Sequence, residues 1–164
     1  MASPSTVTLM LAMALTGVHA SFACAMGQAP PAVAAKAVVT GAVAAQVCVT
    51  PSATDLRALQ DDRQRAVIVL HAFEPPWPSS GRLVASLLAG TPPTPREITR
   101  FAVHPLQAFT AEQPQRSQRF TLSLAGYAHL LQAGRPVCLQ IGFDAGAHPG
   151  EGGRAEVSIE LSPA

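Results

Sequence analysis

The sequence has 164 residues, of which 48% are hydrophobic and 13% are charged. The charged fraction is about half of the usual ~25%, which excludes a highly charged disordered chain. The 11 basic and 10 acidic residues give a net charge of +1. This balance offers no basic surface for phosphates, so we expect no nucleic-acid partner.

Residues 1 to about 20 are predicted to be a cleavable signal peptide. The apolar run Leu9–Leu15 is too short to span a bilayer, which takes ~20 residues, and small residues follow it at Val18–Ala20. Cleavage is expected after residue 20, or after residue 23 at the second candidate site Ser21–Ala23. The segment Met1–Thr8 lacks the usual basic residues, so a buried N-terminal helix is the alternative.

Cys24 gives the leader a second interpretation. Cleavage before this cysteine would make the chain a lipoprotein tethered through a lipidated Cys24, although Ser21 stands where such motifs usually have leucine. No other segment is apolar enough to span a membrane. Because 10 of the 11 basic residues are arginine, and because alanine and proline are abundant, we expect a bacterial protein. From the leader we expect it to be periplasmic or secreted, or to be a lipoprotein.

Residues 24–35 are predicted to be a flexible lead-in, and residues 36–164 a single β-sandwich domain. The first half of this domain alternates between apolar runs and breaks rich in proline and glycine. We expect one or two strands in Lys36–Val49, a short helix or polar loop in Ser52–Arg65, a central strand in Arg65–Phe73, a turn in Glu74–Gly81, and strands in Arg82–Ala89 and Glu97–His104.

In the last third, apolar and polar residues alternate clearly. We expect strands in Arg119–Leu124, Val137–Phe143 and Ala155–Leu161, a helical turn or two in Ala125–Gln132, and a glycine-rich loop in Asp144–Gly153. The fold class is therefore all-β: an antiparallel β-sandwich of about seven strands, immunoglobulin-like or similar, with one short helix near residues 125–132.

Cys48 and Cys138 are predicted to form a disulfide, the usual state of two separated cysteines in an oxidising compartment. Apolar residues flank each cysteine, so both would point to the face of their strands opposite the core. Two buried free thiols are the alternative. A metal pair is less favoured because no second ligand lies at metal-binding spacing.

No catalytic motif is present, so we expect no enzyme and no cofactor. Ser79 and Ser80 lie beside Gly81 without a nucleophile-elbow motif, and the adjacent Asp61 and Asp62 do not face one another on a helix. The four histidines after the leader lack metal-ligand spacing from one another, although they could converge in space on copper or zinc. These are His71, His104, His129 and His148.

The segment from Glu74 through Pro75, Pro76, Trp77 and Pro78 is the candidate partner-binding turn. Trp77 is the only tryptophan, and a tryptophan between prolines makes a rigid apolar surface suited to protein recognition. The alternative is that Trp77 folds over one end of the sandwich.

From Arg65 onward the order of features resembles the C-terminal β-sandwich domain of tyrosinases and polyphenol oxidases. The resemblance is carried by the strand and proline turn VIVLHAFEPPWPSSGRLVASLL and by QRFTLSLAGYAHLL, RPVCLQIGF and AEVSIEL. The histidine-bearing copper domain of that family is absent. The resemblance implies an accessory or chaperone protein for a copper enzyme of the tyrosinase type.

These observations favour an exported, non-catalytic β-sandwich that binds a protein or an envelope component. The accessory role for a copper enzyme is the alternative. The protein partner is not identified by the sequence.

Overall fold

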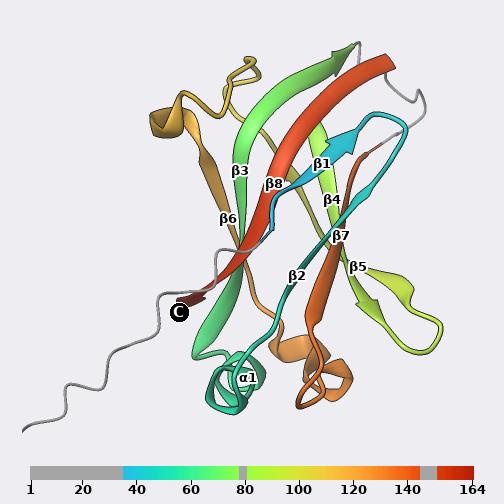
Figure 1. Ribbon diagram of the computed structural model, residues 1–164, viewed down its shortest axis with the longest axis vertical. Coiled ribbons are helices and arrows are strands. Elements are labelled where there is room, and N and C mark those ends of the chain that lie inside the picture. The colour runs from blue at the N-terminus through green and yellow to red at the C-terminus, as the bar shows by residue number, and fades with distance from the viewer. Residues whose placement is uncertain (1–34, 78–80, 145–150) are drawn as a thin grey trace, which may run out of the picture. The chain divides into compact units, whose positions relative to one another are not determined.

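The computed structural model describes residues 35–77, 81–144 and 151–164. In this part of the chain there are eight β-strands, one α-helix and two 3-10 helices (Figure 1). In chain order they are β1 (Ala37–Thr40), β2 (Ala45–Val49), α1 (Ala53–Gln60), β3 (Gln64–Trp77), β4 (Arg82–Ala89), β5 (Thr94–Ala102), η1 (Pro114–Arg116), β6 (Gln118–Leu122), η2 (Ala125–Leu130), β7 (Val137–Phe143) and β8 (Glu151–Pro163).

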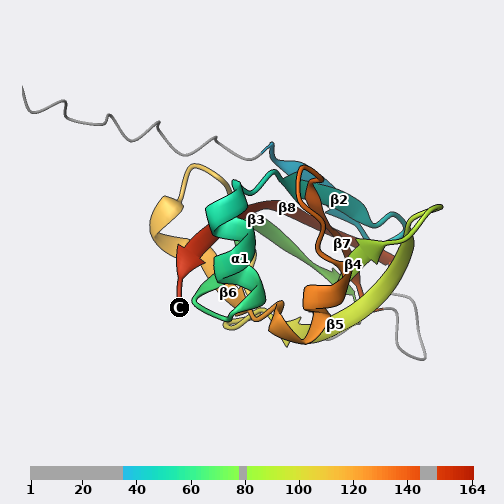
Figure 2. The same cartoon turned by 90° about the horizontal axis from the view of Figure 1, so that it is seen from below.

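The strands form two four-stranded sheets, with the orders β1-β8-β3-β6 and β2-β7-β4-β5. All pairs are antiparallel, and the two sheets pack face to face (Figures 1 and 2). The predicted all-β sandwich is confirmed. Eight strands replace the expected seven or so because the segment 36–49 contributes one strand to each sheet.

The core follows the alternation of the strands. In β7 the inward residues Val137, Leu139 and Ile141 are at most 4% exposed, and in β8 Val157 and Ile159 are fully buried. Since successive strand residues point to opposite faces, the residues between them lie on the outer surfaces. The strands predicted from alternation in Val137–Phe143 and Ala155–Leu161 are confirmed.

Helix α1 covers one end of the sandwich (Figure 2). It begins with a capping box, in which Ser52 Oγ accepts from the Asp55 amide at 3.1 Å and Asp55 accepts from the Ser52 amide at 3.2 Å. Its buried side chains, Leu56 and Leu59, join the core between the sheets. The segment that the sequence left open between helix and loop is therefore a helix.

Strand β3 is the centre of its sheet, as expected, and it is buried on both faces. On its outer face Val67 is 3% exposed and Val69 is 7% exposed. Arg119 of β6 lies opposite Val69, Glu160 of β8 lies opposite Val67, and these two charged side chains form an ion pair. The ion pair therefore crosses over β3 and shields its two outward valines from water.

The predicted turn at Glu74–Gly81 is wrong in its first half. Residues Glu74–Trp77 continue β3, with Glu74 opposite Arg154, and residues 78–80 lie outside the described part of the chain. The glycine-rich loop is shortened correspondingly, because β8 begins at Glu151. A Cβ on Gly153 would lie 2.8 Å from Pro76 Cβ, so the proline-rich end of β3 can pair because its partner strand carries glycine there.

The remaining predicted elements are confirmed with small shifts. Strand β4 has the expected bounds, and η2 is the expected short helical segment. Strand β5 starts at Thr94 rather than Glu97 and includes Pro95. This proline is tolerated because β5 is the edge strand of its sheet, where one side of the backbone has no ladder partner.

Candidate functional site

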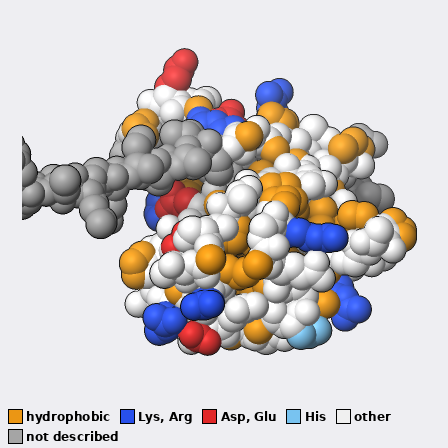
Figure 3. Space-filling view, turned by 60° about the horizontal axis from the view of Figure 1, so that its bottom comes forward, with side chains coloured by type: hydrophobic (Ala, Val, Ile, Leu, Met, Phe, Trp, Pro, Cys, Tyr) orange, Lys and Arg blue, Asp and Glu red, His pale blue; other side chains and the backbone are white. Residues whose placement is uncertain are grey.

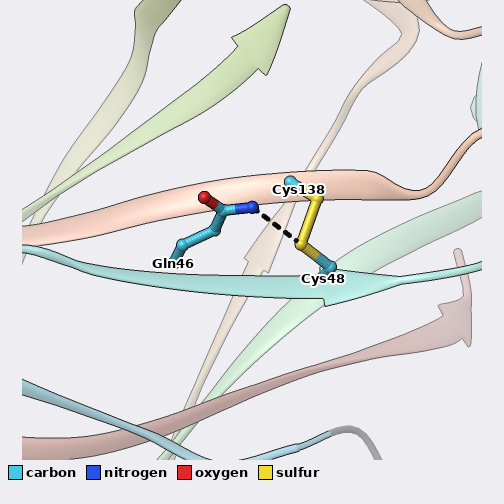
Figure 4. The surroundings of a disulfide bond; sticks show 3 residues. All are labelled: Gln46, Cys48 and Cys138. Carbon is cyan, nitrogen blue, oxygen red and sulfur yellow. Dashed lines mark hydrogen bonds between the residues drawn. A yellow bond between two sulfur atoms is a disulfide. The ribbon is translucent and has the colours of Figure 1, made fainter. Parts of the chain in front are cut away.

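Cys48 and Cys138 form a disulfide, as predicted. They lie directly opposite each other on the paired strands β2 and β7, with their Cα atoms 4.1 Å apart. Val47, Val137 and Leu139 beside them are at most 4% exposed, so the sulfurs lie on the outer face of the sheet. Gln46 Nε2 donates to Cys48 Sγ at 3.2 Å (Figure 4).

A cavity of about 250 Å³, here called the Cys138 cavity, lies beside this disulfide. Residues of β4, the turn after it and the segment 130–138 surround it, together with Gln46 of β2. Its walls include Leu87, Leu88, Leu130, Leu131, Val137 and Cys138. Arg135 is the only charged residue among those that line it.

A larger hollow of about 580 Å³ lies on the other sheet, between the ends of β3 and β8 and the loop before η1. We call it the Arg116 recess. Phe73 and Phe109 lie beneath it, and their backbones form a two-bond bridge with N···O distances of 2.9 Å in both directions. Both side chains are nearly buried, at 2% and 4% exposure, so they fix the floor of the recess from the core side.

Arg116 is held rigidly at the wall of this recess. Its guanidinium donates to the Ala108 carbonyl at 3.0 Å and to Gln107 Oε1 at 3.2 Å. The same group lies 5.7 Å from the centre of the Phe109 ring, within the range of a cation–π contact. A half-buried arginine fixed in this way loses little rotamer freedom when a ligand binds.

The other charged side chains of the recess come from the paired strands β3 and β8. Glu74 lies opposite Arg154, and Glu156 lies opposite Ala72. Glu156 also pairs with Lys36 at 2.8 Å. Arg154 has no ion pair in the described part of the chain. The recess therefore combines small apolar side chains above two buried phenylalanines with charged groups of both signs.

The predicted partner-binding segment is divided by the structure. Glu74 lies on the recess, whereas Pro75 and Pro76 belong to the strand pair with β8. Trp77 ends β3, and Pro78 lies outside the described residues. The segment is thus a strand end beside the recess rather than a free turn.

The three histidines within the described residues lie on different elements. His71 Nε2 is hydrogen-bonded to Ser158 Oγ at 2.8 Å on the outer face of the first sheet, while His104 and His129 lie on the segments after β5 and within η2. His148 and Cys24 lie outside the described residues. Within 35–77, 81–144 and 151–164, no three His, Cys, Asp or Glu side chains are placed to hold a metal ion. The accessory role for a copper enzyme stays a prediction.

Sequence reasoning missed the recess because its residues come from three separate segments. Glu74, Arg116 and Arg154 are brought together only by the β3–β8 register and by the bridge at Phe109. One signal was available: Phe109 is the only aromatic residue in the polar stretch 105–118. A single aromatic residue in such a stretch often anchors a loop to the core.

None of the helices in the described part of the chain combines the length and hydropathy needed to cross a bilayer. Comparison of the chain with family models, with curated proteins and with solved structures gives no match.

Proposed function

We propose that this chain is an exported, non-catalytic binding protein that holds a segment of a protein partner in the Arg116 recess. The observation that carries the proposal is the preorganised Arg116 guanidinium above Phe109. Its two hydrogen bonds and its ring contact are made before any ligand arrives, so binding needs little reordering there. A volume of about 580 Å³ is of ordinary size for a binding site.

The mixed charges of the recess favour a polypeptide over other ligand classes. Two arginines and two glutamates line the recess together with alanine side chains, which suits an apolar residue flanked by one acidic and one basic side chain. A polyanion would meet Glu74 and Glu156 as well as the arginines. The wider surface is mixed too, since basic and acidic side chains are interspersed on the face in Figure 3.

Export is supported by the disulfide and by the predicted leader. Disulfides persist in oxidising compartments and are rare in the cytosol, and Cys48–Cys138 joins two strands of this domain. We propose a periplasmic or secreted location, with lipidation of Cys24 as the membrane-tethered form.

The binding proposal can be tested with a capped pentapeptide that places phenylalanine between one glutamate and one arginine. Titration of the 15N-labelled protein should move the amide signals of Ala72, Phe109 and Arg154, with Kd below about 1 mM, a binding free energy of about −4 kcal/mol. Replacing the central phenylalanine of the peptide by alanine should abolish the shifts. Arg116→Ala and Arg154→Gln should each weaken binding by about tenfold.

Arg135→Gln is the matched control, because Arg135 is also exposed but lines the other cavity. It should leave peptide binding unchanged. Shifts that are scattered over both sheets, or equal binding by the Arg116 and Arg135 variants, would contradict a site in the recess. A peptide with lysine at every charged position should bind more weakly, since it meets two arginines.

A further inference from the structure

The Cys48–Cys138 disulfide borders the Cys138 cavity through one of its two cysteines. Both cysteines are half-buried, and the cavity is lined by Cys138 and by Gln46 of β2 but not by Cys48. In the sheet order β2-β7-β4, Cys48 lies on β2, Cys138 on β7, and Leu87 and Leu88 of the cavity wall on β4. Apart from Gln46, the lining residues belong to β4, to β7 and to the segments next to them, so most of the cavity lies on the β4 side of Cys138.

This placement matches the geometry of thiol–disulfide exchange. A thiolate attacks one sulfur along the S–S axis, and the other sulfur leaves on the far side. A thiol seated in the Cys138 cavity approaches Cys138 Sγ from the β4 side, with Cys48 Sγ on the opposite side as the leaving group.

Gln46 assists the same direction of cleavage. Its Nε2 donates to Cys48 Sγ at 3.2 Å (Figure 4). Hydrogen bonds to an ionised acceptor are about twice as strong as those to a neutral one. The contact therefore strengthens as negative charge develops on Cys48, and Cys48 is the sulfur better prepared to leave.

The walls of the cavity indicate which thiols fit. Leu88, Leu130 and Leu131 are apolar, and Arg135 is the single charge. Arg135 has no ion pair in the described part of the chain. It would attract a thiolate and would pair with a carboxylate on the same small molecule.

We propose that Cys48–Cys138 is a thiol–disulfide exchange site for small carboxylate-bearing thiols, which bind in the Cys138 cavity. The incoming thiolate forms a bond to Cys138 Sγ, the Cys48–Cys138 bond breaks, and its electron pair leaves on Cys48 as a thiolate. A second molecule of the thiol then attacks the mixed disulfide. The two small thiols are oxidised to their disulfide, and the two cysteines are reduced. This site is independent of the Arg116 recess.

The test uses the folded protein in a Cys24→Ser background, so that only two of the three cysteines remain. Reduction by 3-mercaptopropionate and by uncharged 2-mercaptoethanol is followed by mass spectrometry after trapping with iodoacetamide. Each rate is divided by the rate of the same reagent on the urea-unfolded protein. The folded protein should favour the anionic thiol by about three- to fivefold, the size of one exposed ion pair.

Arg135→Gln should remove this preference, whereas Arg154→Gln, which removes an exposed arginine from the other sheet, should retain it. Gln46→Leu should slow exchange with both reagents. The trapped intermediate should carry the small thiol on Cys138 and the alkyl group on Cys48. A mixed disulfide on Cys48, a preference that survives Arg135→Gln, or reduction that occurs only at the rate of global unfolding would overturn the proposal. None of these outcomes depends on peptide binding at the recess.

Discussion

His71 shows how one side chain is tuned by its position in a sheet. The register of β3 against β8 shifts between Leu70 and Ala72, and this irregularity places His71 beside Ser158, whose side chain is buried. Burial is the main cause that lowers the pKa of His71 from its ordinary value of 6.5, and the charge of Lys36 adds to it. The nearby Glu156 acts in the opposite direction.

The lowered pKa predicts a specific dependence of stability on pH. The unfolded chain takes up the His71 proton at a higher pH than the folded chain does, so the free energy of unfolding is greatest above pH 6.5. The free energy of unfolding should fall as the pH drops from 6.5 to the pKa of His71 in the folded protein. Below that pKa, His71 causes no further loss of stability. His71→Gln should reduce this fall between pH 7 and pH 5 in urea unfolding.

An NMR titration of the His71 ring gives the direct measurement, with a midpoint below 6.5 expected. His129→Gln, at an exposed position, is the control and should leave the contribution of His71 intact. A His71 midpoint at or above 6.5 would show that burial does not dominate at this ring.

At the scale of elements, the pairing of β3 with β8 is the feature that most departs from the sequence rules. Two prolines near the end of β3 would ordinarily break a strand. The partner strand accommodates them with Gly152 and Gly153, which have φ values of +72° and +78°. At Gly153 the strands also approach closely, since an added Cβ would meet Pro76.

Gly153→Ala should destabilise the protein by about 2–3 kcal/mol, from the left-handed backbone and the contact with Pro76 together. Gly152→Ala is the matched control, because its φ is similar but nothing lies within 4 Å of the added Cβ. It should cost about 1–2 kcal/mol, from the backbone alone. Chemical denaturation measures both. Equal losses would show that the approach of Pro76 is unimportant.

The elements differ in how far the sequence could predict them. Alternation over Val137–Phe143 was sufficient, because one face of β7 is buried. It failed at Glu74–Trp77, where the deciding residue, Gly153, is far away in the sequence. The disulfide was predictable from spacing and compartment, but not the cavity beside Cys138, which depends on β4 and η2 packing near it. The Arg116 recess depends on the β3–β8 register and on the bridge at Phe109, for which the single aromatic residue in 105–118 is the only local signal.

At the scale of the whole molecule, several links join the two sheets of the sandwich. The short connection from β1 to β2 passes from one sheet to the other. At the opposite edges, Phe101 of β5 lies 4.2 Å from Phe120 of β6, measured between ring centroids. Helix α1 and η2 join at one end through Gln60, which donates to the Ala128 and Leu131 carbonyls. The disulfide adds a covalent link within the second sheet.

Removing that link should have a large effect on the whole fold. The bonded cysteines are 90 residues apart, and a loop of this size corresponds to about 4–5 kcal/mol in the chain-entropy model. Cys48→Ala/Cys138→Ala should therefore lose a large part of the usual 5–15 kcal/mol of stability. Urea denaturation measures the loss. A double variant within about 1 kcal/mol of the oxidised protein would contradict this estimate.

The position of the disulfide also determines how the domain would respond to a pulling force. Strand β1 pairs antiparallel with the last strand, β8, so a load applied between the two ends of the described chain first peels that pair apart from one end. Further extension then stops at the sulfur bridge, because the chain from Cys48 to Cys138 is a closed covalent loop. At ~3.4 Å per residue, this loop has a contour length of about 300 Å, which the pulling force cannot extend while the disulfide is intact. A reducing thiol would release it, so the mechanical reach of the protein depends on its redox state.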